Sequence, residues 1–181
     1  VCMLWGNDDD PGTFTMSGGS ITKNEALNGG GLYAAAKSTF TMSGSSAISE
    51  NTAASDDDDD GHGGGVYMRG SFTMSGSSTI SGNKATNDGA GVFVAGSYGQ
   101  TAGSFILNGG TISTPTDASV NDVDGVYVGY EGKFFMNGGT STLEIIGQLK
   151  NHGATIITNN VMAFDAASGG NCSIICTGGE Y

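Results

Sequence analysis

Basic residues are scarce in this chain. Lys and Arg together number 6 against 18 Asp and Glu, which gives a formal net charge of -12. Nucleic acids are bound through basic patches, and anionic membrane surfaces attract basic segments. The charge balance therefore argues against nucleic acid and against anionic lipid as partners. It fits a surface in contact with water and with divalent cations.

Long apolar runs are absent as well, and no stretch is long enough to span a bilayer. No signal peptide is visible and the first residue is Val1, so we expect a processed chain or a segment of a longer one. Cysteine is rare and odd in number: Cys2, Cys172 and Cys176. This count permits one disulfide with a thiol left over, or an intermolecular bridge.

What the sequence does contain is a repeat. Phe-Thr-Met-Ser-Gly occurs at 14–18, 40–44 and 72–76, with variants at 105–109 and 134–138. The central residues of the five copies are 26, 32, 33 and 29 residues apart. Self-similarity at such a period is typical of a solenoid, and it outweighs local secondary-structure signals.

Each repeat holds three short strand-like phrases: the Phe-x-Met phrase, an Ile-centred phrase such as 79–81, and a Gly-led apolar phrase such as 65–67. A helix is disfavoured because 33 of the residues are Gly and no window keeps a 3.6-residue period. Three strands per unit can wind one coil of a parallel β-helix. We therefore predict an all-β, right-handed parallel β-helix of about five to six coils, with the handedness taken from the family named below.

Side-chain alternation sorts the inner from the outer positions. The predicted inner columns are Phe14/Met16, Phe40/Met42 and Phe72/Met74, then Ile21, Ile48, Ile80 and Ile112, then Leu32/Ala34, Val66/Met68, Val92/Val94 and Val126/Val128. Each coil buries too few apolar side chains to be stable alone, so stability depends on stacking.

We expect a single domain over 1–181. Residues 1–11 form a partial N-terminal coil with an Asp-rich insertion, 12–140 the regular repeats, and 141–181 a divergent coil or a cap. Because Val1-Cys2-Met3 aligns with Val66-Tyr67-Met68, the chain is expected to begin on a third strand. Further strands are expected at 142–146, 154–158, 161–164 and 172–176.

The segments Gly63-Gly64-Gly65-Val66-Tyr67, Phe105-Ile106-Leu107-Asn108 and Phe134-Phe135-Met136-Asn137 resemble the paired GGA-[ILV] and FxxN repeats of polymorphic outer-membrane proteins. Those are autotransporter-like bacterial surface proteins, and the resemblance implies a right-handed β-helix passenger with an adhesive role. It covers roughly 12–140 and departs where Ser17, Ser43 and Ser75 replace the Asn. Such repeats specify a scaffold more than a function.

An acidic run is the candidate metal site, because Ca²⁺ prefers several oxygen ligands. It comprises Asp56, Asp57, Asp58, Asp59 and Asp60, with a second run at Asp8, Asp9 and Asp10. Its spacing matches neither an EF-hand nor the Gly-Gly-x-Gly-x-Asp nonapeptide. A solvated charge run that keeps the protein soluble is the favoured interpretation.

No catalytic group can be assembled from the sequence. His62 and His152 are isolated in different coils, the remaining acids are scattered, and Arg69 is the only arginine. We expect a non-enzymatic protein. The Thr15, Thr41 and Thr73 column could order water as in ice-binding solenoids, but it ends where Ile106 and Phe135 face outward. Ordinary strand propensity on a solvated sheet is the favoured interpretation.

The Gly-led strand carries an outward aromatic column beside apolar inner residues, and a strand apolar on both faces is normally covered on both. Its members are Tyr33, Tyr67, Phe93 and Tyr127, together with Cys2. The cover is either a partner, such as another subunit or a sugar, or the chain's own 83–90 and 97–103 loops. In a strand Cys172 and Cys176 are too far apart for a disulfide, so each is expected to bridge to a partner segment, with Cys2 of this chain or of another subunit as the candidate.

The leading functional hypothesis is an extracellular or cell-surface structural subunit that stacks on itself head to tail into a filament or surface fibre. The alternative is a segment of a bacterial adhesin that binds host protein or glycan. No cofactor is expected other than the candidate Ca²⁺.

Overall fold

The computed structural model describes residues 2–4, 10–56, 60–96, 101–113, 124–136, 143–146, 148–151, 155–158, 165–166 and 173–176. Side chains are described within 10–56, 60–96, 101–113 and 125–135. Across these ranges the regular secondary structure is β-strand, and every strand pairing is parallel. The predicted all-β parallel solenoid is confirmed.

The strands form four sheets, here called A to D. Sheet A holds β1 (Cys2–Leu4), β5 (Leu32–Ala34), β9 (Val66–Met68), β13 (Val92–Val94), β16 (Asp124–Val128), β19 (Gln148–Asn151) and β21 (Asp165–Ala166). Sheet B holds β2 (Thr13–Met16), β6 (Thr39–Met42), β10 (Ser71–Met74), β14 (Ser104–Leu107), β17 (Lys133–Met136), β20 (Thr155–Thr158) and β22 (Ser173–Cys176).

Sheet C holds β3 (Ser20–Thr22), β7 (Ala47–Ser49), β11 (Thr79–Ser81), β15 (Gly110–Ser113) and β18 (Leu143–Ile146). Sheet D holds β4 (Glu25–Ala26), β8 (Thr52–Ala53) and β12 (Lys84–Ala85). We number the coils from β2, so coil 1 runs from β2 to β5, coil 2 from β6 to β9, coil 3 from β10 to β13 and coil 4 from β14 to β16.

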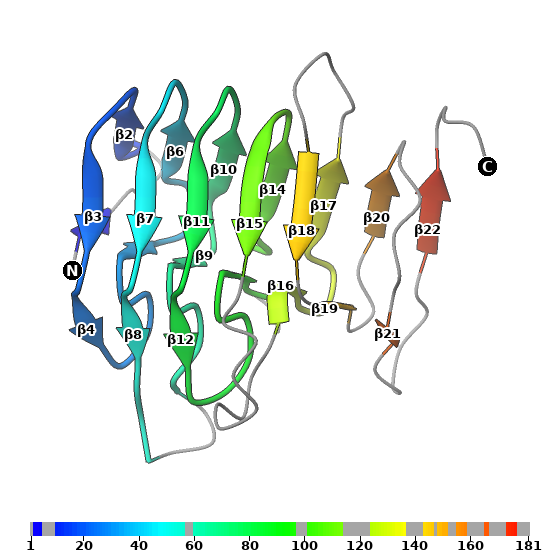
Figure 1. The fold of residues 1–181 in the computed structure, drawn as a ribbon. Coiled ribbons are helices and arrows are strands. Elements are labelled where there is room, and N and C mark those ends of the chain that lie inside the picture. The colour runs from blue at the N-terminus through cyan, green and yellow to red at the C-terminus, as the bar shows by residue number, and fades with distance from the viewer. Residues whose placement is uncertain are drawn as a thin grey trace.

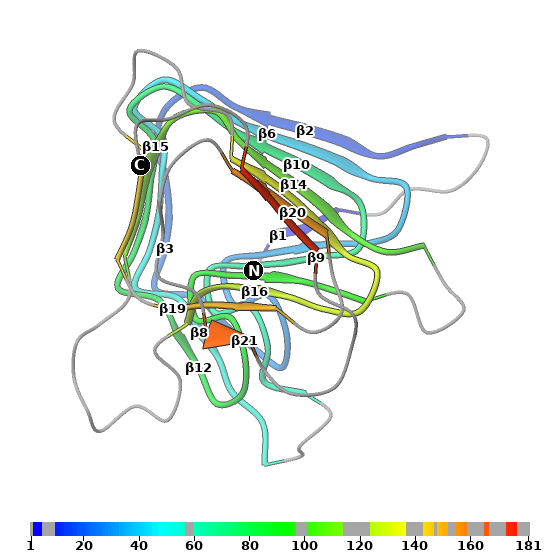
Figure 2. The same cartoon turned by 90° about the vertical axis from the view of Figure 1, so that its right-hand side faces the viewer.

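The coils stack side by side along one axis, from the N-terminal end to the C-terminal end (Figure 1). Seen from the C-terminal end, sheets A, B and C form the three sides of a triangle, and sheet D extends the corner between C and A (Figure 2). In that view the chain runs counter-clockwise as it approaches the viewer, so the solenoid is right-handed, the usual hand of parallel crossovers.

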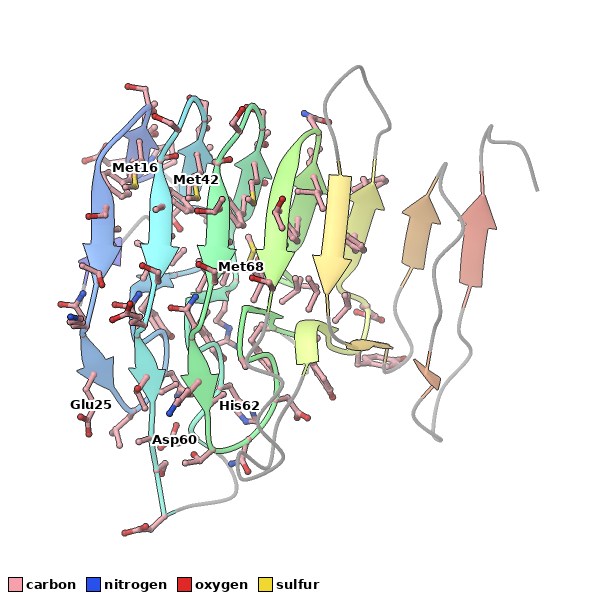
Figure 3. All side chains as sticks on the ribbon, viewed as in Figure 1. Met16, Glu25, Met42, Asp60, His62 and Met68 are labelled. Atoms are coloured by element: carbon pink, nitrogen blue, oxygen red, sulfur yellow. The ribbon has the colours of Figure 1, made fainter. Side chains whose placement is uncertain are left out.

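The inner columns are those expected. Phe40, Phe72, Phe105 and Phe134 are fully buried, and their rings stack on one another with centroids 4.7, 4.6 and 5.2 Å apart. Figure 3 shows Met16 and Met42 at equivalent positions of successive coils. The Ile column and the inner pairs of sheet A complete the same core. Each side chain therefore packs on its own counterpart one coil away.

A short two-residue strand in each of the first three coils was not predicted. β4, β8 and β12 form sheet D, and Ala53 and Ala85 pack with Ala90 in a second small cluster. The chain reaches this sheet through residues with positive φ, namely Lys23 (58°), Glu50 (56°) and Gly82 (63°). Such left-handed residues turn the chain sharply at the ends of β3, β7 and β11.

The alignment of the N-terminal strand was wrong by one residue. In β1, Cys2 lies opposite Leu32 and Met3 opposite Tyr33. Cys2 therefore does not share the register position of the aromatic column. The segment Cys-Met-Leu-Trp is apolar at every position, so alternation could not distinguish the two registers.

The divergent segment after residue 140 continues the coils. β18, β20 and β22 extend sheets C and B in register, near the strands expected at 142–146, 154–158 and 172–176. Among the described residues, sheets A and B reach seven strands each, which makes six coils from β2 to β21 with β1 before them and β22 after them, in agreement with the five to six coils predicted. The strand expected at 161–164 lies outside the described residues. Within the described part of the chain, no helix is long and apolar enough to cross a membrane.

Candidate functional site

The outer face of sheet A carries a regular column of stacked aromatic side chains. Tyr33, Tyr67, Phe93 and Tyr127 occupy one register position in β5, β9, β13 and β16, as predicted. Their rings stack nearly parallel, with successive centroids 4.9, 5.1 and 4.9 Å apart. The constant parallel register fixes this spacing.

Part of the cover over this column comes from the chain itself. His62 stacks on Phe93 with ring centroids 4.4 Å apart, and Phe93 is only 9% exposed. The loops expected to cover the column were 83–90 and 97–103. His62 belongs instead to the 60–64 segment of coil 2. Residues 97–100 lie outside the described residues. Tyr33, Tyr67 and Tyr127 are half-buried.

The 60–64 segment is tied to the coils on both sides of it. His62 N–H donates to Asn28 Oδ1 (2.9 Å) in coil 1, and Nδ1 of His62 accepts from Asp88 N–H (3.1 Å) in coil 3. Asn28 also donates to Asp60 Oδ1 (2.6 Å), and Asn87 donates to the Asp60 carbonyl. Figure 3 shows Asp60 and His62 on the side of the molecule near β12. His62 thus has a structural role that its isolation in the sequence did not reveal.

The phenol of Tyr67 lies in a less polar environment than water. Burial raises its pKa, the neighbouring Tyr33 and the Asp60 carboxylate raise it further, and Arg69 lowers it. The Nε atom of Arg69 is itself buried, and no described group accepts a hydrogen bond from it. The Tyr67 phenol is therefore neutral at physiological pH.

The stacking restricts what the column can bind. Sugars pack on the faces of aromatic rings, but both faces of Tyr67 and Phe93 are occupied by neighbouring rings. Ring edges and the Tyr hydroxyls are what the column offers to an outside molecule. This geometry favours a packing role over a carbohydrate platform.

The Asp run of coil 2 is described only at its ends. Asp56 is exposed, and Asp60 accepts from Asn28, whereas Asp57 to Asp59 lie outside the described residues. No group of three or more His, Cys, Asp or Glu side chains placed to hold a metal occurs in the described ranges. The Ca²⁺ site stays a prediction, as does any role of Asp8 and Asp9; His152 also falls outside the described ranges.

The cysteines are separated by the fold. Cys2 lies in β1, the first strand of sheet A, and Cys176 in β22, the last strand of sheet B. The rung spacing of about 4.8 Å puts these strands on the order of 25–30 Å apart along the axis, beyond disulfide reach. A Cys2–Cys176 bridge within one chain is therefore excluded, while a bridge between chains stays a prediction. Cys172 lies outside the described residues.

The first coil is less completely buried than those after it. Phe14 and Ile21 are half-buried, whereas their counterparts Phe40 and Ile48 are fully buried. Phe14 stacks on Phe40 at 5.3 Å, in the same column as the other rings. β2, β3 and β4 are the end strands of sheets B, C and D. Within the described residues, coil 1 therefore presents sheet edges together with partly exposed core side chains.

A ladder of Asn side chains was also missed. Asn24, Asn51 and Asn83 each stand three residues after the inner Ile of their coil, and their side chains hydrogen-bond from coil to coil. The signal was the recurrence of Asn at this one position.

Comparison with protein-family models, with curated proteins and with solved structures found no match for this chain.

Proposed function

We propose that this protein is a non-enzymatic, extracellular or cell-surface structural solenoid, and that it extends into a fibre by stacking a further copy on coil 1. The observation that carries the proposal is the edge of coil 1, with its end strands and its half-buried Phe14 and Ile21. An open edge of a parallel sheet is a template for another strand.

The direction of the backbone groups in β2 supports this role. The carbonyls of Gly12 and Met16 accept from the N–H groups of Thr39 and Ser43 in β6. Because alternate residues of a parallel strand bond to opposite neighbours, the N–H and C=O groups of Thr13 and Thr15 point to the other edge. They are the groups that a further strand would pair with.

The side chains add a hydrophobic term to these hydrogen bonds. A further coil would complete the burial of Phe14 and Ile21, as coil 2 does for Phe40 and Ile48. Full burial of a large apolar side chain contributes roughly 1.5–3 kcal/mol, so completing two half-buried ones contributes a similar amount in total. The contact is thus of the kind that already holds the coils together.

Strands of sheets A and B form both ends of the described stack. Sheets A and B begin with β1 and β2 and end with β21 and β22. A contact between these two different ends is heterologous, and a heterologous contact that does not close into a ring gives an open filament. Bridges between cysteines of successive copies would be compatible with this arrangement.

Thr15→Pro tests the proposal, because it removes the outward N–H of β2 while keeping the hydrogen bonds to β6. Thr15→Val is the matched control, since it keeps the N–H and the strand propensity. Sedimentation velocity across a concentration series should show wild type and Thr15→Val growing into rods and Thr15→Pro staying small. A wild-type protein that sediments as a monomer at every concentration, or a Thr15→Pro variant that assembles equally well, would refute it.

A further inference from the structure

The outward side chains of the sheet B strands in coils 1 to 3 are all Thr or Ser. The outward residues of these strands are Thr13 and Thr15 in β2, Thr39 and Thr41 in β6, and Ser71 and Thr73 in β10. They pair in strict register, Thr13 with Thr39 and Ser71, and Thr15 with Thr41 and Thr73. None is charged, although the chain carries a formal charge of -12.

The hydroxyls therefore form a two-dimensional array. Successive rungs are about 4.8 Å apart, and the two outward positions of one strand are about 6.6 Å apart. Figure 2 shows sheet B as a straight side of the cross-section, so the array lies on a flat face. Thr13, Thr15, Thr39 and Ser71 are exposed, and Thr41 and Thr73 are half-buried between them.

These hydroxyls are available to a ligand. Of the hydroxyls in this array, only that of Thr13 hydrogen-bonds to another described residue, in a long 3.5 Å bond to the Pro11 carbonyl. Thr is stiff at χ1, so the positions of its hydroxyl and methyl groups vary little and ordering them costs little entropy. The array is preorganised by the strand register.

The face is too small and too polar for a protein partner. Three rungs of four residues cover on the order of 200 Å² by strand dimensions, against the roughly 800 Å² per partner of a stable interface. It also lacks the aromatic and arginine side chains that anchor protein contacts. It has no aromatic ring on which a sugar could stack, and the rings of sheet A are occupied by one another.

An ordered lattice of water matches the face in both charge and periodicity. It is uncharged, it exchanges hydrogen bonds with hydroxyls, and the prism planes of hexagonal ice repeat in two directions at distances close to those of this array. We infer that the outer face of sheet B in coils 1 to 3 binds ice. The face ends at coil 4, where Ile106 replaces the Thr of the preceding rungs.

Thr41→Lys places a charge at the centre of the array, between Thr15 and Thr73. Ser77→Lys is the matched control, because Ser77 is exposed in the turn after β10 and lies off the face. A third variant, Thr79→Lys, carries the same change on the hydroxyl-bearing outer face of sheet C. A fourth variant, Thr73→Lys, repeats the change on a second rung of sheet B. Far-UV circular dichroism checks that each variant is folded.

The assay is inhibition of ice recrystallisation by the purified protein in a frozen sucrose film. Wild type, Ser77→Lys and Thr79→Lys should inhibit crystal growth, and Thr41→Lys and Thr73→Lys should lose the activity. An inactive wild type would overturn the inference. Full activity in both sheet B variants would overturn it too, and loss in Thr79→Lys alone would assign the activity to sheet C instead.

Discussion

The side-chain amide of Asn51 donates a 3.0 Å hydrogen bond to the side-chain oxygen of Asn83, one coil away, and both residues are almost completely buried. The same oxygen of Asn83 accepts from the backbone N–H of Asn51 (2.9 Å). Asn51 in turn accepts both equivalent bonds from Asn24. Each Asn therefore satisfies buried donors of the preceding coil and locks the register of the corner between sheets C and D.

Replacing Asn51 by Ala should destabilise the fold by about 2–4 kcal/mol. The change removes the acceptor for the Asn24 N–H groups and the donor to the Ile21 carbonyl, and each buried polar group left unpaired costs about 1–3 kcal/mol. Asn24→Ala is the control, because Asn24 ends the ladder and is only half-buried. Denaturant unfolding should rank Asn51→Ala clearly below Asn24→Ala in stability; equal losses would argue that the ladder does not carry the stability.

Gly64→Ala should destabilise strongly, while Gly18→Ala should be close to neutral. A Cβ at Gly64 would meet the backbone carbonyl of Lys84 and would lie 2.6 Å from that of Ala90, so main chain in the next coil would have to move. A Cβ at Gly18 would meet nothing within 4 Å. We expect a loss of about 1–3 kcal/mol for the first, as for overpacked cores, and a change within about 1 kcal/mol for the second. Thermal unfolding of both variants checks the contrast, and a tolerated Gly64→Ala would contradict the close stacking.

Ala90 occupies the position of Gly64 one coil further along, and its side chain is fully buried. Sheet D ends at β12 among the described residues, so coil 3 has more room there than coil 2. The Gly requirement thus comes from the neighbouring sheet D strand, and not from the turn itself.

Alkaline pH should lower the free energy of unfolding through deprotonation of the Tyr67 phenol. Its pKa is raised in the folded state, chiefly by burial, so the folded chain holds this proton more tightly than the unfolded chain does. The stabilisation is complete below the unfolded value of about 10 and is lost as pH rises through the higher folded value. Urea unfolding between pH 8 and pH 11 should show a decline that is reduced in Tyr67→Phe. The same decline in both proteins would assign it to other groups.

The longer strands could be predicted from sequence because their two faces differ. Phe72 and Met74 alternate with Ser71 and Thr73, and stacking of identical phrases fixes which strand pairs with which. β12 is only two residues long, Lys84 and Ala85, so it has no period to detect. The predicted register of β1 was wrong because this strand is apolar at every position, so neither of its faces is marked as the inner one.

The aromatic column was also predictable, but its surroundings were not. Alternation places Tyr67 and Phe93 outward, whereas the stacking of His62 on Phe93 depends on how the coil 2 insertion returns to the sheet. That path is set by hydrogen bonds of Asn28 and Asp88 in two other coils. Contacts between loops of variable length leave no periodic trace in a sequence.

Residue-resolved hydrogen exchange of Thr15 tests most directly whether the edge of β2 receives another coil. The amide of Thr73, the equivalent residue in β10, lies between paired strands on both sides and serves as the internal reference. If a further copy stacks on coil 1, the Thr15 amide should exchange fast in dilute protein and gain protection with concentration, approaching Thr73 in the assembled state. Fast exchange at Thr15 within assembled rods would contradict it, because the fibre would then be built through another surface.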